Sequence, residues 1–330
     1  MSLAGLGEFG LIARIRAQVQ DPADLPLGIG DDCAAARVPP GELLLTTTDL
    51  LIEQVHFRRD WTRARDLGRK SVAVNISDIA AMGGIPRQLF LGVGIPEDFL
   101  LSEIEAFLEG VLEAAADYGA SLAGGDTCRS PGPLFISVTA QGSVPPEELL
   151  TRSGARPGDG IYVSGTLGDS ALALRQLQAG QLPSPDLARR HHDPRARVEL
   201  GRQLAAAKLA SAMIDLSDGL LGDLGHILQA SGVGARLEPR LLPLSAALRQ
   251  ALPAAAEQQE LALTGGEDYE LLFTVPPARQ TAVAALASGG LPLTRIGVIG
   301  AEAGVELLAA DGSPLALPKG GFRHFAPASH

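Results

Sequence analysis

Cysteine is scarce in this sequence. Only Cys33 and Cys128 occur in 330 residues, which is too few for a disulfide-stapled scaffold or a four-cysteine zinc site. The His-x-x-x-His and Cys-x-x-Cys spacings that indicate zinc are missing as well. A reducing, cytoplasmic compartment is therefore expected. Both thiols are expected to be small buried residues, because free cysteine is usually buried.

The sequence also has no long apolar run and has fewer basic than acidic residues. No apolar run approaches about 18 residues, so we expect no membrane-spanning helix. Glu8 interrupts the apolar N-terminal stretch, and no secretory signal is expected there. The sequence has 27 Lys and Arg against 38 Asp and Glu, a formal net charge of −11, which disfavours nucleic-acid binding. A polyanionic substrate would need metal cations to approach such a chain.

The few lysines exclude one common nucleotide site. Lys70, Lys208 and Lys319 are the only lysines, and none stands in the glycine-rich Gly-Lys-Ser/Thr motif of P-loop enzymes. Residues 28–30, Gly-Ile-Gly, are followed by Asp-Asp-Cys, so the dinucleotide fingerprint fails too. Protein-kinase signatures are absent. Any nucleotide site must be of another type.

The length and composition predict a globular protein of two domains or one large α/β unit. Hydrophobic residues make up 46% of the chain and charged residues 20%, which is enough apolar material for a sizeable core. Residues 144–160 are rich in Pro and Gly and form the best candidate junction. We therefore expect an N-terminal domain of residues 1–145 and a C-terminal α/β domain of residues 146–330.

Apolar patterns that are typical of strands alternate with patterns that are typical of helices, as in mixed α/β proteins. Strands are expected at 43–48, 87–95, 134–140, 161–164, 269–275 and 294–299, with a short one ending at Asp215; helices are expected at 66–82, 102–117, from about 168, and from about 220 to 228. The helical spacing in the first of these helices predicts that Asn75 and Asp78 share one face.

Acidic residues recur where Gly-rich turns are expected to follow apolar stretches. They lie in segments 28–32, 47–49, 124–127 and 215–219, and at Asp78. Any one of these could be a solvated turn. Five together favour a site for cations and phosphate, because Mg²⁺ takes one or two carboxylates along with substrate phosphates and water.

Seven motifs give the chain a resemblance to a known family. They are residues 7–9, 28–34, 75–83, 124–127, 151–155, 215–219 and 265–271. In this order, and with the final His324-Phe325, they resemble the thiamine-monophosphate kinase family, a branch of the aminoimidazole ribonucleotide synthetase superfamily. Gly-Gly-Asp is shared across that superfamily, whereas Asp-Leu-Ser-Asp-Gly at 215–219 and Gly-Gly-Glu-Asp-Tyr-Glu-Leu at 265–271 are more specific.

The resemblance implies a fold, a reaction and partners. The fold would be α/β with mixed sheets in two domains of the aminoimidazole ribonucleotide synthetase-like type. The N-terminal domain, residues 1–145, would bind ATP and Mg²⁺ and would pair its strands with those of a second subunit in a homodimer. The reaction would be the ATP-dependent phosphorylation of thiamine monophosphate by direct in-line transfer. Several Mg²⁺ ions would serve as cofactors and ATP as co-substrate, with no nucleic acid or membrane involved.

The same resemblance implies roles for individual residues. The metal ligands would be Asp32, Thr47, Thr48, Asp49, Asp78, Asp126, Asp215 and Asp218, of which Asp126, Asp215 and Asp218 would also be catalytic. ATP would contact Gly124, Gly125, Arg152 and Ser217. Thiamine monophosphate would contact His56, Glu267 and Phe322, where Phe322 stands in place of the family's usual Trp or Tyr.

Other interpretations stay open from the residues alone. Arg152 could be a solvated linker arginine, His56 a structural histidine and Glu267 a turn carboxylate. The basic run at residues 189–192 is expected to need no ligand. For the whole chain, the alternatives are a sister ATP-dependent synthetase with another acceptor, such as a formamidine, or a non-catalytic nucleotide-sensing dimer.

Overall fold

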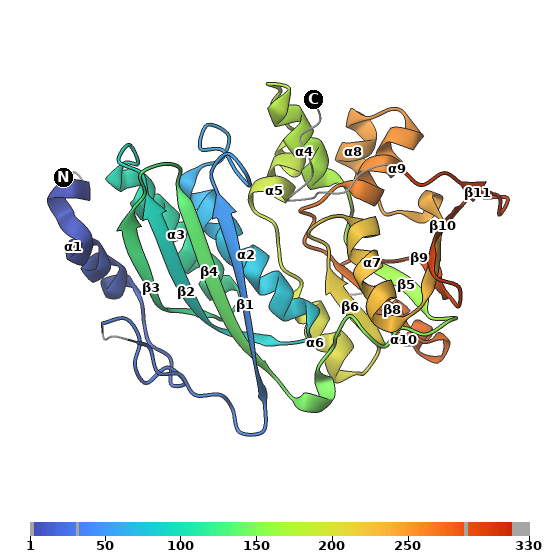
Figure 1. The fold of residues 1–330 in the computed structure, drawn as a ribbon, viewed down its shortest axis with the longest axis horizontal. Helices are drawn as coiled ribbons and strands as arrows, with labels where there is room; N and C mark the ends of the chain where they lie inside the picture. Colours follow the sequence, from blue (N-terminus) through green and yellow to red (C-terminus); the bar gives the residue numbers. More distant parts are fainter. Residues whose placement is uncertain (1–2, 31–32, 287–289, 319–330) are drawn as a thin grey trace. The chain divides into compact units, whose positions relative to one another are not determined.

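The computed structural model describes residues 3–30, 33–286 and 290–318, apart from the side chains of residues 3–6, 8 and 9. The chain divides into two compact units, Met1–Leu149 and Leu150–His330. Each unit contains its own β-sheet, as Figure 1 shows. None of the helices among these residues is long and apolar enough to cross a membrane.

The N-terminal unit is built on a four-stranded sheet of order β1-β4-β2-β3. Its strands are β1 (Leu43–Ile52), β2 (Ile85–Ile95), β3 (Ser121–Arg129) and β4 (Phe135–Val144). Its helices are α1 (Leu3–Gln18), α2 (Ala64–Ala81) and α3 (Leu101–Asp117), followed by the 3₁₀ turn η1 (Pro146–Glu148). β4 is antiparallel to both β1 and β2, whereas β3 is parallel to β2.

One face of this sheet is covered by α2 and α3, which pack against each other (Figure 1). Side chains along β1 alternate between buried and exposed, because successive residues of a strand point to opposite faces and the helices cover only one face. Leu45 and Leu51 are buried on the helix-covered face, whereas Leu44 and Leu50, on the other face, are 49% and 48% exposed. We call that second face the open face of the sheet.

A β-bulge changes the pattern along β3. Leu89 of β2 pairs with Leu122, but the next residue, Phe90, pairs with Gly124, so Ala123 is the extra residue. Beyond the bulge, Asp126 pairs with Gly92. Residues 47–49 and 124–127 therefore lie inside strands. The expectation that their carboxylates stand in Gly-rich turns was wrong for these two segments.

The C-terminal unit contains a seven-stranded sheet of order β11-β10-β7-β9-β5-β8-β6. Its strands are β5 (Gly160–Ser164), β6 (Ala212–Asp215), β7 (Gly234–Leu237), β8 (Leu271–Val275), β9 (Leu293–Gly300), β10 (Gly304–Leu308) and β11 (Pro314–Leu315). Its helices are α4 (Asp169–Gln178), α5 (Pro185–His192), α6 (Val198–Ala206), α7 (Leu220–Ser231), α8 (Ala246–Ala251), α9 (Ala255–Thr264) and α10 (Gln280–Leu286), with 3₁₀ turns η2 (Pro239–Leu241) and η3 (Pro277–Arg279).

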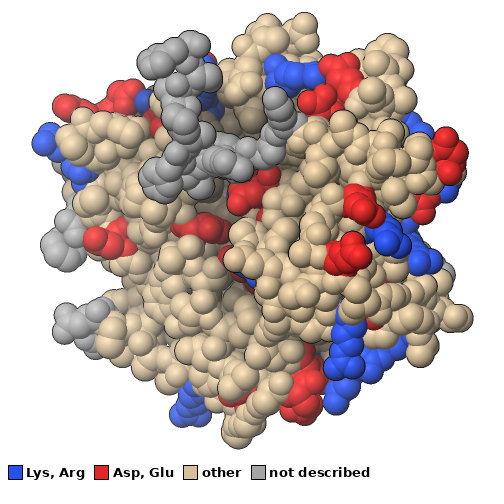
Figure 2. All heavy atoms as spheres, turned by 45° about the vertical axis from the view of Figure 1, so that its right-hand side comes forward, with Lys and Arg blue, Asp and Glu red and all other residues tan. Residues whose placement is uncertain are grey.

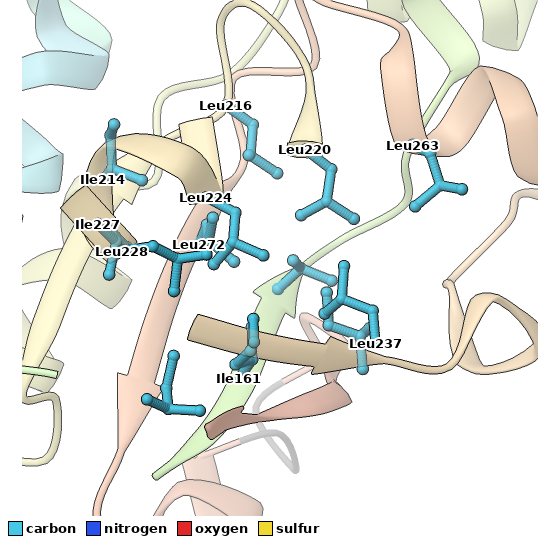
Figure 3. Packing of buried hydrophobic residues seen from close by; sticks show 14 of the residues in the cluster. Ile161, Ile214, Leu216, Leu220, Leu224, Ile227, Leu228, Leu237, Leu263 and Leu272 are labelled. Carbon is cyan, nitrogen blue, oxygen red and sulfur yellow. The ribbon is translucent and has the colours of Figure 1, made fainter. Parts of the chain in front are cut away.

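The core of the C-terminal unit lies between the sheet and α7. Leu224 and Ile227 of α7 pack into a buried cluster with Ile161 of β5 and Leu272 of β8, and Figure 3 shows these side chains directed toward one another. Leu216, 1% exposed, belongs to the same cluster. It fixes the chain directly after β6, which matters because Ser217 and Asp218 follow it.

Surface charge is mixed rather than gathered by sign. On the face that Figure 2 shows, acidic and basic side chains occur close to each other at several places among uncharged residues. Ion pairs such as Arg65–Glu113 and Arg175–Glu257 are examples of such neighbours.

Cys33 and Cys128 are free and exposed, so the expectation that they would be buried was wrong.

The two-domain, mixed α/β fold expected from the sequence is confirmed. The expected strands at 87–95, 161–164 and 294–299 and the helix at 102–117 match β2, β5, β9 and α3 to within a few residues. Helices α5, α8 and α9 were not anticipated. They are short, and short helices give little periodic signal.

Candidate functional site

Strand β1 and helix α2 bring together three of the expected metal ligands. Thr47 Oγ1 donates a 2.5 Å hydrogen bond to Asp78 Oδ2, and the backbone N–H of Asp49 donates to Asn75 Oδ1 at 2.9 Å. Asn75 and Asp78 thus face the same strand, as their helical spacing predicts. Thr47 and Asp49 are two residues apart on the helix-covered face. Thr47 is thereby joined directly to Asp78, and Asp49 is joined to the same helix through its backbone.

Thr48 lies apart from these residues. It occupies the intervening position of β1, so its side chain is on the open face. Its Oγ1 donates to the carbonyl oxygen of Val138 at 3.1 Å and accepts from Thr139 Oγ1 at 3.2 Å. The hydroxyl of Thr48 is therefore engaged with β4, on the side of the sheet opposite to Asp49 and Asp78.

A cavity of about 770 Å³ lies in the N-terminal unit beside β3. Apolar side chains of α1, β2 and α3, among them Leu11, Val93 and Phe107, line most of it. Residues 124–127 and 28–30 supply polar and glycine backbone to the same cavity. An apolar wall with a few polar groups at one side is typical of small-molecule sites of this size.

Glycine at position 125 is required by the fold itself. A Cβ atom there would lie 2.0 Å from the backbone oxygen of Leu91, and φ is +152°. At Gly124 a Cβ would meet only the ring of Phe90, at 3.1 Å. The close approach of β3 to β2 thus explains Gly125 without any ligand. Gly124 is the residue at which the absence of a side chain leaves room in the cavity.

His56 lies in the turn that follows β1. Its Nδ1 accepts a 3.0 Å hydrogen bond from the backbone N–H of Ile52. An accepting Nδ1 carries no proton, so the neutral ring has its proton on Nε2. The turn therefore presents His56 as a donor through Nε2. Within the N-terminal unit, this donor stands at the end of the strand that carries Thr47 and Asp49.

In the C-terminal unit, the two most specific motifs meet. Residues 215–219 leave β6 and residues 265–271 enter β8, and these strands are neighbours, with Asp215 opposite Leu271. Three 2.8 Å backbone bonds join the segments: Leu216 N–H to the Glu270 carbonyl, Tyr269 N–H to the Leu216 carbonyl, and Glu267 N–H to the Ser217 carbonyl. Ser217, Asp218 and Glu267 are thereby held at one edge of the sheet.

Asp223, which sequence analysis missed, fixes the first of these segments. Its Oδ2 accepts from the backbone N–H groups of Ser217, Asp218 and Gly219, each at 3.1 Å. Burial, together with the nearby charge of Asp218, raises the pKa of Asp223 to about 7. The signal in the sequence was an acidic residue in the first turn of the helix that follows Gly219, a position that suits a carboxylate.

The second segment is anchored by helix α5 and the loop behind it. Glu270 is fully buried and accepts from Arg197 Nε at 2.6 Å, from Ser164 Oγ at 2.5 Å and from Arg190 Nη1 at 2.9 Å. The Nδ1 atom of His191, which is 4% exposed, lies 3.4 Å from Glu267 Oε2. Residues 189–192 were expected to need no ligand, and two of them, Arg190 and His191, are contacted by carboxylates of the same chain about 80 residues away in the sequence.

Asp268 lies between these two acidic residues. It is 3% exposed, and its Oδ2 accepts the backbone N–H of Gly168 at 2.8 Å. Burial raises the pKa of Asp268 to about 8, although the positive charge of Arg190 opposes this shift. A carboxyl group in such surroundings holds its proton near neutral pH.

The remaining expected residues have less defined surroundings. Arg152 is exposed, and its carbonyl oxygen accepts from Ser231 Oγ at 3.3 Å. Asp215, at the end of β6, is 4% exposed. Asp32 and Phe322 lie outside the described residues.

The carboxylate and hydroxyl oxygens at these positions are of the kind that Mg²⁺ binds. Across the described part of the chain, no three His, Cys, Asp or Glu residues gather in a ready-made metal centre. The carboxylates occur singly or in pairs beside hydroxyl groups, as at Thr47 and Asp78. Mg²⁺ takes such oxygen ligands in small numbers and completes its coordination with water and phosphate.

Both units match known protein families. Residues 30–144 match the family described as AIR synthase related protein, N-terminal domain, and residues 156–309 match its C-terminal domain. The thiamine-monophosphate kinase of Escherichia coli (strain K12) is 44% identical over 328 residues, which cover 97% of this chain and 98% of that protein. The thiamine-monophosphate kinase of Bacillus subtilis (strain 168) is 35% identical over 328 residues, covering 97% and 100% respectively.

Solved structures are similar over the same extent. The thiamine-monophosphate kinase from Stenotrophomonas maltophilia K279a superposes with a TM-score of 0.84 at 45% identity, covering 96% of this chain and 99% of that one. AaThiL complexed with AMPPCP and TMP superposes with a TM-score of 0.76 at 36% identity, covering 98% and 99%. The hydrogenase maturation protein HypE, at 22% identity and a TM-score of 0.75, shares the fold.

Proposed function

Since this chain belongs to the thiamine-monophosphate kinase family, we propose that it transfers the γ-phosphoryl group of ATP to thiamine monophosphate with the help of several Mg²⁺ ions. The chain is an enzyme of that family. The observation that carries the proposal is its nearly full-length similarity to AaThiL complexed with AMPPCP and TMP. AMPPCP is an ATP analogue, so that complex contains the two kinds of substrate that the proposed reaction needs.

The proposed reaction is an in-line displacement at phosphorus. An oxygen of the phosphate of thiamine monophosphate forms a bond to the γ-phosphorus of ATP, while the bond from that phosphorus to the β,γ-bridging oxygen breaks. The bond's electron pair leaves with ADP. The attacking oxygen is already deprotonated near neutral pH, so the enzyme needs no general base and contributes positioning and charge neutralisation.

In the N-terminal unit, we assign the cavity beside β3 to the nucleotide. Its apolar wall suits the base, and Gly124 leaves space for a ligand near Asp126. The oxygens of Thr47, Asp49 and Asp78 would hold Mg²⁺ on the helix-covered face. Thr48 and Asp126, which lie on the open face, and Asp32 would be ligands of further Mg²⁺ ions. Bound Mg²⁺ supplies neutralisation of the phosphate charge that an acidic protein would otherwise repel.

In the C-terminal unit, Ser217 and Asp218 would contact the nucleotide and metals, together with Asp215. Arg152 is exposed and able to pair with phosphate. Glu267 would recognise the cationic thiazolium or the aminopyrimidine of the substrate through charge or hydrogen bonding. His56, with its donor at Nε2, and Phe322 complete the proposed contacts to thiamine monophosphate.

We also propose a homodimer that covers the open face of the N-terminal sheet, and a cytoplasmic location. Leu44 and Leu50 stand about half exposed on that face, which is costly for large apolar side chains unless another surface covers them. The strand register continues from Leu50 through Ser137 and Gly92 to Asp126. A second copy on the open face would therefore approach the proposed site.

The proposed cytoplasmic location rests on the two cysteines. Free cysteines suit a reducing cytoplasm.

The direct test is turnover. Purified protein is incubated with ATP, Mg²⁺ and thiamine monophosphate, and thiamine diphosphate is measured by its fluorescent oxidation product. We expect product from the wild type and a loss of at least about a hundredfold in turnover for Asp126→Asn and Asp215→Asn, because a neutral amide is a poor ligand for Mg²⁺. Asp186→Asn, on the exposed side of α5, is the matched control and should keep full activity.

The outcome of this test separates the alternatives. Near-normal turnover of both variants at saturating Mg²⁺ would refute their roles. ATP binding without ADP formation, whatever the acceptor, would favour a nucleotide sensor. Phosphorylation of another acceptor in place of thiamine monophosphate would favour a sister synthetase.

A further inference from the structure

Two adjacent residues of helix α5 contact the two ends of the segment 267–270. Arg190 Nη1 lies 2.9 Å from Glu270 Oε1, and His191 Nδ1 lies 3.4 Å from Glu267 Oε2. Neither contact is between residues close in the sequence. The helix therefore stands directly behind the motif to which Glu267 belongs.

The backbone of this segment needs such support. Glu267 and Tyr269 have φ values of +65° and +49°, in the left-handed region that non-glycine residues seldom adopt. Such conformations persist where surrounding contacts hold them, and they concentrate at functional sites. At Glu270 the holding contacts are two arginines and a serine. At Glu267 the backbone N–H is bound to Ser217, and the side chain reaches His191.

A favourable contact between His191 and Glu267 depends on which ring nitrogen of His191 carries a proton. An ionised carboxylate only accepts hydrogen bonds, so a favourable contact with Glu267 requires a proton on Nδ1 of His191. Ser170 Oγ lies 2.9 Å from the same nitrogen, and a serine oxygen can accept a share of that proton. The side chain of His191 is 5% exposed, whereas that of Glu267 is 24% exposed. The histidine is buried behind a carboxylate that is partly open to solvent.

We propose that His191 is a positioning residue that holds the carboxylate of Glu267 in the orientation that recognises thiamine monophosphate. The inference rests on the role proposed above for Glu267. It assigns no contact between His191 and the substrate. Its consequence is selective: removing the Nδ1 donor weakens the recognition of thiamine monophosphate and leaves the nucleotide site unaffected.

The test compares three variants by their Michaelis constants. We expect His191→Ala to raise KM for thiamine monophosphate about tenfold, because a contact with a charged group is lost, while KM for ATP stays within about twofold. His191→Asn, whose amide N–H can replace the Nδ1 donor, should restore most of the affinity. Arg189→Ala is the matched control, since Arg189 lies on the same helix with 69% of its side chain exposed.

A double-mutant cycle with Glu267→Gln then separates positioning from general support. If His191 acts through Glu267, His191→Ala adds little to the effect of Glu267→Gln. Additive effects, or equal increases in both Michaelis constants, would overturn the inference. If His191→Ala fails to fold, His191→Leu takes its place, and unfolding of both variants would show a purely structural role and overturn it as well.

Calorimetric titration with thiamine monophosphate alone distinguishes a failure of the proposed reaction from a failure of the inference about His191. A wild type that binds this compound but forms no diphosphate would contradict the proposed reaction, and the cycle could still be completed on dissociation constants. A wild type that does not bind it would overturn both proposals.

Discussion

At the scale of single residues, the unusual feature is the number of acidic groups placed in the interior. Asp223 and Asp268 are 2% and 3% exposed, and burial raises the pKa of each, to about 7 and about 8. Both stand directly behind residues assigned to ligand contacts. Their contribution to stability is therefore linked to pH in a direction opposite to that of paired surface carboxylates.

This linkage gives a prediction for Asp268. Its pKa rises from about 3.8 in the unfolded chain to about 8 in the folded protein, so between these pH values the folded state binds the extra proton. Stability from this group is present at the acidic end of the window and is lost as pH rises toward 8. We expect Asp268→Asn, which imitates the protonated form, to gain roughly 3 to 6 °C in melting temperature relative to the wild type between pH 5.5 and 8.

The measurement is a series of thermal melts of both proteins at several pH values. The pKa of Asp223 is also raised, but Asp223 is present in both proteins. The difference between their melting temperatures therefore reports on Asp268 alone. A difference that is constant across the window would show that Asp268 binds the same number of protons in the folded and unfolded chains there.

At the scale of elements, α2 and α3 of the N-terminal unit pack in very close contact. A Cβ at Gly68 would lie 2.0 Å from the backbone oxygen of Phe107, and a Cβ at Gly110 would lie 2.0 Å from that of Arg65. The helices touch backbone to backbone at these two glycines. This contact sets how closely α2, and with it Asn75 and Asp78, approaches β1.

We predict that Gly110→Ala destabilises the protein by about 2 to 4 kcal/mol, because the methyl group forces the two helices apart. Gly225→Ala in α7 is the control. No heavy atom lies within 4 Å of a Cβ placed there, so the better helix propensity of alanine should stabilise that variant by about 0.5 to 1 kcal/mol. Urea titration of the two variants checks both values, and equal midpoints would contradict the close contact.

Elements also show what the sequence could and could not predict. The spacing of Asn75 and Asp78 correctly placed both on one face of α2, because a helix repeats every 3.6 residues; that this face is turned to β1 is known only from the structure. The position of Thr48 away from Asp49 follows from strand alternation once β1 is known. The link between Arg190 and Glu270 had no local signal, since ionic partners 80 residues apart leave no periodic pattern.

At the scale of the whole molecule, the proposed homodimer depends on the open face of the N-terminal sheet. We predict that Leu50→Lys converts a dimer of the wild type into monomers, because a buried, unpaired charge at an interface costs several kcal/mol. Sedimentation velocity measures the change. Leu182→Lys, at a leucine of the C-terminal unit that is 92% exposed, should remain dimeric. A monomeric wild type, or a dimeric Leu50→Lys, would rule out this interface.

The extra residue at Ala123 has a consequence for how this protein could evolve. A shorter chain that lacked it would pair Leu122 with Leu89 and Gly124 with Phe90 in unbroken alternation, so the side chains after Leu122 would keep their faces. Asp126 would stay opposite Gly92. The loss of this one codon would thus straighten the strand and leave the acid on the same side of the sheet.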